Sequence, residues 1–106
     1  MTSQRRPRKR SAKRFAVVWT DRAVSDLEAI GDFIATDNPL AAERWVRVLM
    51  AAAEGAAGTP MAWRRVPELG RDDIREVLKR TYRVVYRVRG DRVEVLTIID
   101  PTTLER

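Results

Sequence analysis

Residues 74–99, IREVLKRTYRVVYRVRGDRVEVLTII, contain three short runs in which apolar and charged residues alternate. Alternation with a period of two is typical of β-strands that bury one face. Gly90 and Asp91, between the last two runs, form a tight-turn signal. The sequence therefore predicts a three-stranded antiparallel meander, with strands at Ile74–Leu78, Tyr82–Arg89 and Val93–Ile99.

The first half of the chain predicts a strand and two helices. Phe15–Trp19, FAVVW, is a short apolar run of strand character, and Thr20 after it is a suitable helix N-cap. Asn38 and Pro39 mark the start of a second helix, which ends before Gly58-Thr59-Pro60. Two helices joined so closely fold back as an antiparallel hairpin. Apolar residues at helical spacing give the first helix one buried face: Ala23, Leu27, Ile30 and Ile34.

The order of these elements predicts an α+β fold. Met61–Asp73 contains Pro67 and Gly70 among charged residues and is expected to be a connecting loop. The helical hairpin would then cover one face of a four-stranded sheet and leave the other face to water. A chain of 106 residues is enough for one such domain.

Four basic residues of the meander are candidates for a binding surface. If the strands pair so that their basic rows meet, they form a cationic patch on the solvated face, suited to phosphates or to an acidic peptide. A simpler alternative is that these side chains pair with Glu76 or Glu94 across the strands. The predicted patch consists of Arg75, Lys79, Arg83 and Arg87.

The aromatic residues are expected mainly in the core. Tyr82 and Tyr86 alternate with valines, and Trp19 and Trp45 lie on apolar faces of their elements. Trp63, in the connecting loop, is expected to be exposed.

Composition excludes several kinds of chemistry. The sequence has no Cys and no His, which removes disulfides, thiol nucleophiles, imidazole bases and nearly all transition-metal sites. No cofactor or metal is therefore expected. The sequence has no apolar run of membrane-spanning length, and we expect a cytoplasmic protein without membrane association.

The net charge of +6 belongs to the N-terminal tail. Residues 1–14 carry seven Arg or Lys residues and no acid, so residues 15–106 hold 14 basic and 15 acidic groups, a net charge of −1. Such a tail cannot offset its ordering entropy by apolar burial, and we expect it to be disordered. Its cations are candidates for weak nucleic-acid contact, and the alternative is an unstructured extension without function. The candidate contacts are Arg5, Arg6, Arg8, Lys9 and Arg10.

Residues Pro67–Ile99 resemble the second half of ParE-type toxins. In that family a Gly-Arg loop leads to an Arg-Glu-hydrophobic strand, a Tyr-Arg-x-Val-Tyr-Arg-Val strand, a turn and a final apolar strand. The first half resembles the family as well, with a strand, an acidic helix, an Asn-Pro junction and the paired alanines Ala41 and Ala42. The resemblance covers residues 15–100 and implies a toxin of the RelE/ParE superfamily, from a type II toxin–antitoxin system of the plasmid stabilisation kind.

The resemblance implies one of two modes of growth inhibition. ParE-like toxins bind DNA gyrase and trap its cleaved-DNA complex, whereas RelE-like toxins cleave messenger RNA on the ribosome with basic side chains and often a C-terminal Tyr. Of the nuclease cluster, only Arg83 maps cleanly onto this sequence. Ile74 and Glu76 stand where RelE proteins have lysines, Thr103 stands at a basic position, and no Tyr follows Tyr86.

We therefore interpret the chain as a non-enzymatic gyrase inhibitor with no catalytic residue. The alternatives are a ribosome-dependent endoribonuclease built around Arg83 and a toxin-derived binding module without toxicity. The last is suggested by the C-terminal end, where Asp100-Pro101-Thr102-Thr103 replaces the His and Arg of many relatives. The implied partner is a cognate antitoxin with an acidic, disordered tail, in a toxin–antitoxin hetero-oligomer.

Overall fold

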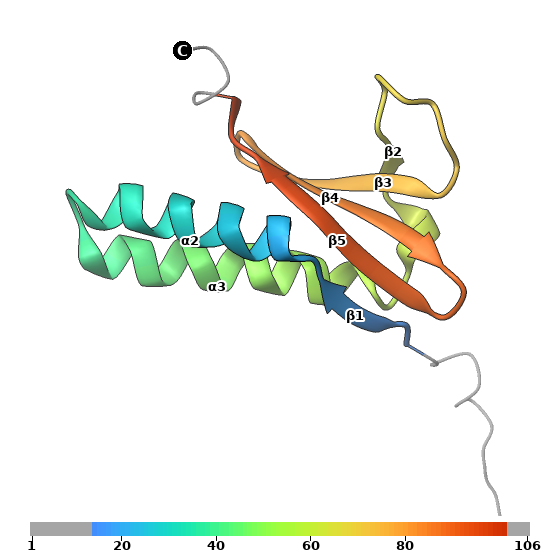
Figure 1. Ribbon diagram of the computed structural model, residues 1–106, viewed down its shortest axis with the longest axis horizontal. Helices are drawn as coiled ribbons and strands as arrows, with labels where there is room; N and C mark the ends of the chain where they lie inside the picture. Colours follow the sequence, from blue (N-terminus) through green and yellow to red (C-terminus); the bar gives the residue numbers. More distant parts are fainter. Residues whose placement is uncertain (1–13, 102–106) are drawn as a thin grey trace, which may run out of the picture.

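The computed structural model describes residues 14–101, which form a two-helix layer against one mixed sheet (Figure 1). In chain order the elements are β1 (Ala16–Trp19), α2 (Asp21–Ala35), α3 (Pro39–Ala56), a 3-10 helix (Pro60–Ala62), β2 (Arg64–Arg65), β3 (Ile74–Lys79), β4 (Tyr82–Arg89) and β5 (Arg92–Ile99). The predicted α+β class and order of elements are confirmed.

The helices begin where their capping residues predict. The side chain of Thr20 accepts a hydrogen bond from the Ala23 amide, and the side chain of Asn38 accepts one from the Ala41 amide. Pro39 occupies the first turn of α3, where its missing N–H removes no intrahelical hydrogen bond. Gly31 lets the two helices approach closely, because a Cβ at this position would lie 3.1 Å from Cγ2 of Val46.

The sheet has five strands in the order β1-β5-β4-β3-β2, one more than predicted. The additional strand, β2, lies in the predicted connecting loop and pairs Arg64 with Glu76 and Arg65 with Arg75. Two charged residues give no periodic signal, so this strand had no mark in the sequence. At the other edge, β1 runs parallel to β5.

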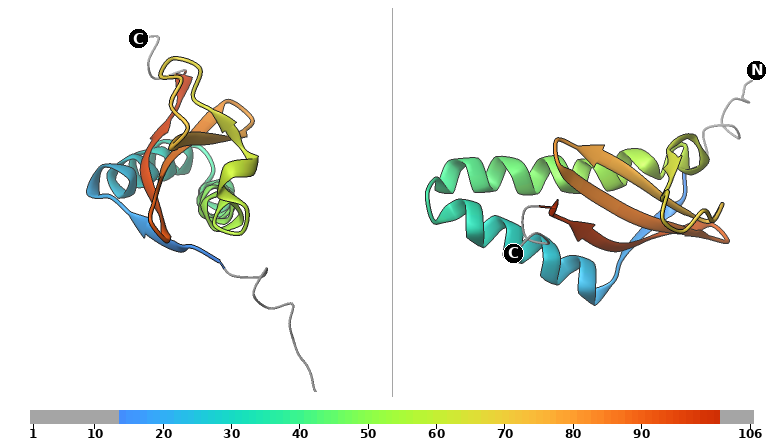
Figure 2. Two further views of the ribbon diagram at one scale, coloured as in Figure 1. Left: turned by 90° about the vertical axis from the view of Figure 1, so that its right-hand side faces the viewer. Right: turned by 90° about the horizontal axis from the view of Figure 1, so that it is seen from above.

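The main core lies between the helices and the sheet, with α2 against β5 and α3 against β3 and β4. Figure 2 shows both helices on one face of the sheet, and their α2–α3 turn reaches past the end of the strands. Tyr86 and Leu49 are fully buried here, while Trp19, Trp45 and Tyr82 pack against the core from partly exposed positions. The predicted core placement of these aromatic residues is confirmed.

Asp26 on α2 binds the part of β5 that extends beyond the end of β1. β1 pairs only with Arg92–Val95 of β5, so the remainder of β5 has no neighbouring strand on that side. The Asp26 carboxylate accepts hydrogen bonds from the Ile98 amide at 3.1 Å and from the Thr97 hydroxyl. One helix side chain thereby satisfies two donors of β5 beyond the end of β1.

The outer face of the sheet, the face turned away from the helices, is partly covered by the segment between β2 and β3. Val66, Ile74 and Val85 are buried together there, with Leu96 and Ile99 packed against them. The prediction that this face is left to water was therefore wrong in part. Val66 and Leu69, in the covering segment, are isolated apolar residues in a charged loop. No periodic pattern in the sequence therefore indicated that this segment would cover the sheet.

The predicted N-terminal tail lies outside the described residues, except for Arg14. Arg14 donates from Nη2 to the carbonyl oxygen of Glu54 near the end of α3. The candidate nucleic-acid contacts from Arg5 to Arg10 and the altered position Thr103 also lie outside the described residues.

Candidate functional site

The register of β3 and β4 separates the four basic residues that were predicted to form one patch. Arg75 lies opposite the buried Tyr86, so Arg75 and Lys79 are on the face that packs on the helices. Arg83 and Arg87 are on the outer face. The prediction of a single four-residue patch is therefore wrong.

The two-residue turn between the strands is the physical reason. Lys79 pairs with Tyr82, leaving only Arg80 and Thr81 in the turn, and this places odd-numbered residues of β3 opposite even-numbered residues of β4. Residues directly opposite each other share a face, so a shift of one residue moves a whole row to the other side. Arg80 adopts a φ of 58°, the left-handed conformation that such a tight turn requires.

Arg75 clamps the segment that connects α3 to β3. Its Nη1 donates to the carbonyl oxygens of Met61 at 3.1 Å and Trp63 at 2.9 Å, and its Nε donates to the carbonyl oxygen of Asp72 at 2.9 Å. Its side chain is largely buried. These contacts use the guanidinium to satisfy backbone acceptors, so Arg75 is part of the structure rather than of a free surface.

Lys79 is the one member of the predicted patch with an unengaged charge in residues 14–101. It is exposed at the end of β3 and lines a shallow groove against α3, together with Gly55 and Trp63. Trp63 is 38% exposed, as predicted for a loop aromatic. This groove lies on a different side of the sheet from Arg83.

Arg83 is held by two carboxylates. Its Nε donates to Oε1 of Glu76 at 2.7 Å, while Nη1 and Nη2 donate to the two carboxylate oxygens of Glu68 at 3.1 and 2.8 Å. The other oxygen of Glu76 accepts a hydrogen bond from Nε of Arg64 at 2.5 Å. The predicted alternative, pairing of an arginine with Glu76, is the arrangement present.

The two acidic partners of Arg83 differ in exposure. The Glu76 side chain has no exposed surface, whereas that of Glu68 is 63% exposed. The hydrogen bonds from Arg83 lower the pKa of Glu68 to about 2, and those to Glu68 and Glu76 raise the pKa of Arg83. Sequence reasoning missed Glu68, because contact with Arg83 depends on how the loop folds back.

Arg87 is paired less completely. Its Nε lies 3.4 Å from Oδ2 of Asp73, yet this buried nitrogen has no hydrogen-bond partner. Asp73 is itself bound through both oxygens by Arg71, which lowers the pKa of the Asp73 carboxyl. Arg87 is therefore held beside Asp73 by charge alone at its buried Nε.

An apolar pocket of about 330 Å³ adjoins Arg83 on the outer face. Glu68 also lines this pocket. The Arg83–Glu68 ion pair therefore lies next to aliphatic side chains. The aliphatic lining consists of Val66, Leu69, Ile74, Val85, Leu96 and Ile99.

Tyr86 has a structural role. It is fully buried, and its hydroxyl donates a hydrogen bond to the carbonyl oxygen of Pro60. Burial raises the pKa of Tyr86 to about 12. A hydroxyl in this position cannot reach a phosphate, so the strand tyrosine offers no general acid.

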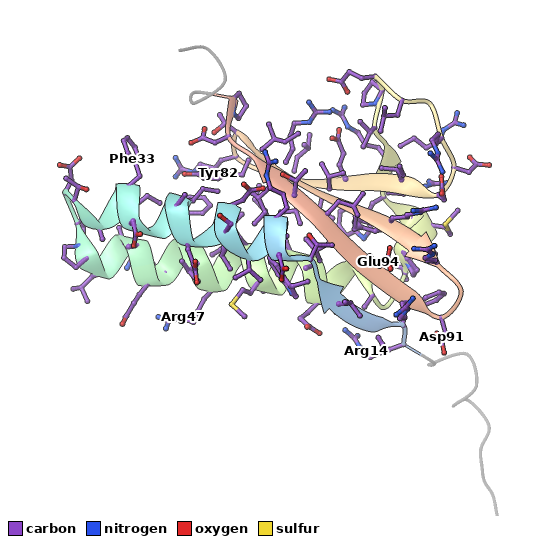
Figure 3. All side chains as sticks on the ribbon, in the orientation of Figure 1. Arg14, Phe33, Arg47, Tyr82, Asp91 and Glu94 are labelled. Carbon is purple, nitrogen blue, oxygen red and sulfur yellow. The ribbon has the colours of Figure 1, made fainter. Side chains whose placement is uncertain are left out.

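The far end of the helical hairpin carries exposed apolar side chains. Phe33 is 67% exposed and Leu40 is 72% exposed. Figure 3 shows Phe33 projecting from α2 on the sheet side of the hairpin and Arg47 pointing away from the sheet. Nearby, the rings of Trp45 and Tyr82 lie 5.5 Å apart, and the Arg80 guanidinium stacks 5.6 Å from the centre of the Trp45 ring.

Comparison with known proteins identifies the family. The family model described as the ParE toxin of the type II toxin–antitoxin system, parDE, matches residues 17–101. The chain belongs to this toxin family. Toxin RelE2 of Caulobacter vibrioides is 50% identical over 44 residues, which are 42% of this chain and 50% of that relative. The matched segment thus spans only half the length of RelE2.

Two solved structures share the fold of this ParE-family chain. The chromosomal ParDE toxin–antitoxin system from P. aeruginosa superposes with a TM-score of 0.68 at 22% identity, over 81% of this chain and 95% of that one. The RelBE2 toxin–antitoxin complex from Mycobacterium tuberculosis superposes with a TM-score of 0.60 at 21% identity, over 82% and 91% of the two chains. The sequence-based assignment to the RelE/ParE superfamily is confirmed.

Residues 14–101 contain neither a metal-binding cluster nor a membrane-spanning helix. No group of three or more Asp or Glu side chains in this range is placed to hold a metal ion. No helix in the same range is long and apolar enough to cross a membrane.

Proposed function

We propose that this ParE-family toxin acts by binding rather than by catalysis, and that its target is DNA gyrase. The observation that carries the proposal is the state of Arg83. It is the only residue that maps onto the nuclease cluster of RelE-like toxins, and Glu76 and Glu68 take up its guanidinium. Stabilising a phosphorane requires positive charge around the phosphate, and here the buried Glu76 places a carboxylate directly beside the Arg83 guanidinium.

A binding toxin needs no catalytic residue, since gyrase itself cuts the DNA. The burial of Tyr86 and the absence of His and Cys from the sequence agree with such a mode of action. The exposed apolar end of the hairpin, with Phe33 and Leu40, supplies contact area of the kind that protein targets use.

We propose further that a cognate antitoxin silences the toxin, as the names of the two toxin–antitoxin structures with this fold suggest. An antitoxin segment that folds on binding must offset its ordering entropy with apolar burial and charge-assisted hydrogen bonds. The outer face offers both, in the apolar pocket and in Arg83.

Ribosome-dependent cleavage of messenger RNA is the second candidate, favoured by the 50% identity to RelE2 over 44 residues. Controlled expression in a bacterial host separates the two. Gyrase poisoning induces the DNA-damage response before translation falls, whereas a nuclease stops translation first and leaves messages cut at codons on ribosomes. An early translation block with intact DNA would overturn the gyrase assignment. Expression without either effect would favour a non-toxic binding module.

A further inference from the structure

The two carboxylates that bind Arg83 differ in how easily another anion can replace them. Glu76 has no exposed side-chain surface and is bound by Arg64 as well, so removing its partners would strand a buried charge. Glu68 is exposed, and an exposed ion pair contributes little net free energy. Water can solvate its carboxylate when that carboxylate is not bound to Arg83. Glu68 is therefore the exchangeable partner.

The local charge balance makes that exchange specific for an anion. Arg64 and Arg83 together balance Glu76 and Glu68, so departure of Glu68 leaves one uncompensated positive charge. That charge is on the Nη1–Nη2 edge of Arg83, which Glu68 now binds through both oxygens. This forked geometry matches a second carboxylate as well as it matches the first.

The pocket beside this edge indicates what kind of anion fits. Its walls are aliphatic, and Leu69 on the covering loop is 54% exposed, so part of this apolar lining faces solvent and is available to an apolar side chain. A peptide with an acidic residue next to a leucine or isoleucine satisfies both features. A nucleic-acid phosphate would place its polar sugar against aliphatic walls, which gains nothing from the pocket.

We propose that Glu68 is an internal stand-in for a partner carboxylate, and that an acidic residue of a partner peptide displaces it from Arg83 while a neighbouring apolar residue enters the pocket lined by Leu69, Leu96 and Ile99. The partner fits the antitoxin of the proposed function, on which this inference rests. Glu68 then lowers the affinity of the site for any acidic segment that lacks an apolar residue beside its carboxylate.

A titration of the full chain tests the exchange without the antitoxin, so its failure is distinct from failure of the proposed function. The probes are two small peptides, N-acetyl-Glu-Leu-amide and N-acetyl-Gln-Leu-amide, with inorganic phosphate as a third ligand. The readout is the NMR signal of the Arg83 Nε–H group. Glu68→Gln removes the competing charge with little change of shape. Glu54→Gln is the matched control, because Glu54 on α3 is 61% exposed and the charge change is identical.

We expect Glu68→Gln to bind the Glu-Leu peptide about fivefold more tightly than the wild type, the size of a released surface ion pair of about 1 kcal/mol. Glu54→Gln should bind it like the wild type, and the Gln-Leu peptide should not respond to Glu68→Gln. In the Glu68→Gln background, Leu69→Ala should weaken binding of Glu-Leu but not of phosphate.

Equal affinity of wild type and Glu68→Gln for the Glu-Leu peptide would overturn the proposal, because Glu68 would then not compete. Phosphate binding as tight as peptide binding in Glu68→Gln would also overturn it and would assign the site to nucleic acid. Thermal unfolding of each variant verifies that the fold is retained, which is expected because Glu54, Glu68 and Leu69 are exposed.

Discussion

At the scale of single residues, the buried acid Glu76 explains much of the chemistry of the sheet. It lies on β3, and Arg64 of β2 and Arg83 of β4 both donate to its carboxylate. A buried carboxylate requires such partners, because an isolated charge out of water is strongly destabilising. Glu76 thus joins three strands of the sheet through one carboxylate.

Glu76→Gln and Glu68→Gln should differ sharply in stability. Glu76→Gln replaces one of the two acceptor oxygens by an NH2 donor and removes the buried counter-charge of both arginines, and we expect the free energy of unfolding to fall by about 2 kcal/mol. Loss of the exposed charge should change it by less than about 1 kcal/mol. Urea denaturation measures both. Similar effects of the two substitutions would show that Glu76 is not the organising charge.

Because Tyr86 is buried, we expect the folded protein to lose stability at high pH. Because burial raises its pKa to about 12 from 10 in an unfolded chain, its stabilisation is complete below pH 10 and is lost as the pH rises toward 12. Tyr86→Phe should lower stability by about 1 kcal/mol at pH 7 through the lost hydrogen bond to Pro60.

Unfolding midpoints measured from pH 9 to pH 12 provide the check. Tyr86→Phe should remove most of the decline in this window and leave the part due to Tyr82, whose pKa burial also raises. A variant that declines as steeply as the wild type would exclude Tyr86 as the source.

At the scale of secondary structure, the edges of the sheet are completed by side chains rather than by strands. β1 stops at Trp19, and Asp26 of α2 then supplies the acceptor that a longer strand would have supplied to Ile98. At the opposite edge β2 has only two residues, and Arg75 fixes the preceding segment through its carbonyl oxygens. A charged side chain thus contributes at both edges, and the Thr20 hydroxyl adds hydrogen bonds to the Val95 and Leu96 carbonyl oxygens on β5.

Asp26→Ala should therefore destabilise the protein more than loss of an ordinary surface acid. The Ile98 amide and the Thr97 hydroxyl lose their acceptor, and we expect a loss of about 1–3 kcal/mol. Hydrogen exchange should locate the effect at Ile98. Asp72→Asn, at an exposed ion pair with Arg65, is the comparison and should change stability little. An unchanged exchange rate at Ile98 in Asp26→Ala would contradict this role of Asp26.

Local signals in the sequence predicted the helices and strands, but they did not predict the contacts between them. Thr20, Asn38 and Gly90 mark ends of helices and strands because caps and turns involve only neighbouring residues. The face on which Arg75 lies depends on the length of the β3–β4 turn, and the contact of Glu68 with Arg83 depends on how a loop folds back. Both are properties of the assembled sheet, so the candidate site was predicted only at Arg83 and Arg87.

At the scale of the whole molecule, two surfaces lie on different sides of one small domain. The hairpin end presents Phe33 and Leu40, and the outer face presents Arg83 with the apolar pocket. The proposed target contact and the proposed antitoxin contact therefore use separate surfaces of the domain.

The most direct test of the gyrase assignment uses purified components. Gyrase, ATP and negatively supercoiled plasmid are incubated with the full chain, and protein-linked double-strand breaks are counted after detergent and protease treatment. We predict that breaks accumulate with the toxin, require gyrase and are retained in Glu68→Gln, while Phe33→Asp abolishes them. Plasmid that stays uncleaved, together with codon-specific cuts in messages on programmed ribosomes, would contradict the account and assign the toxin to the nuclease branch.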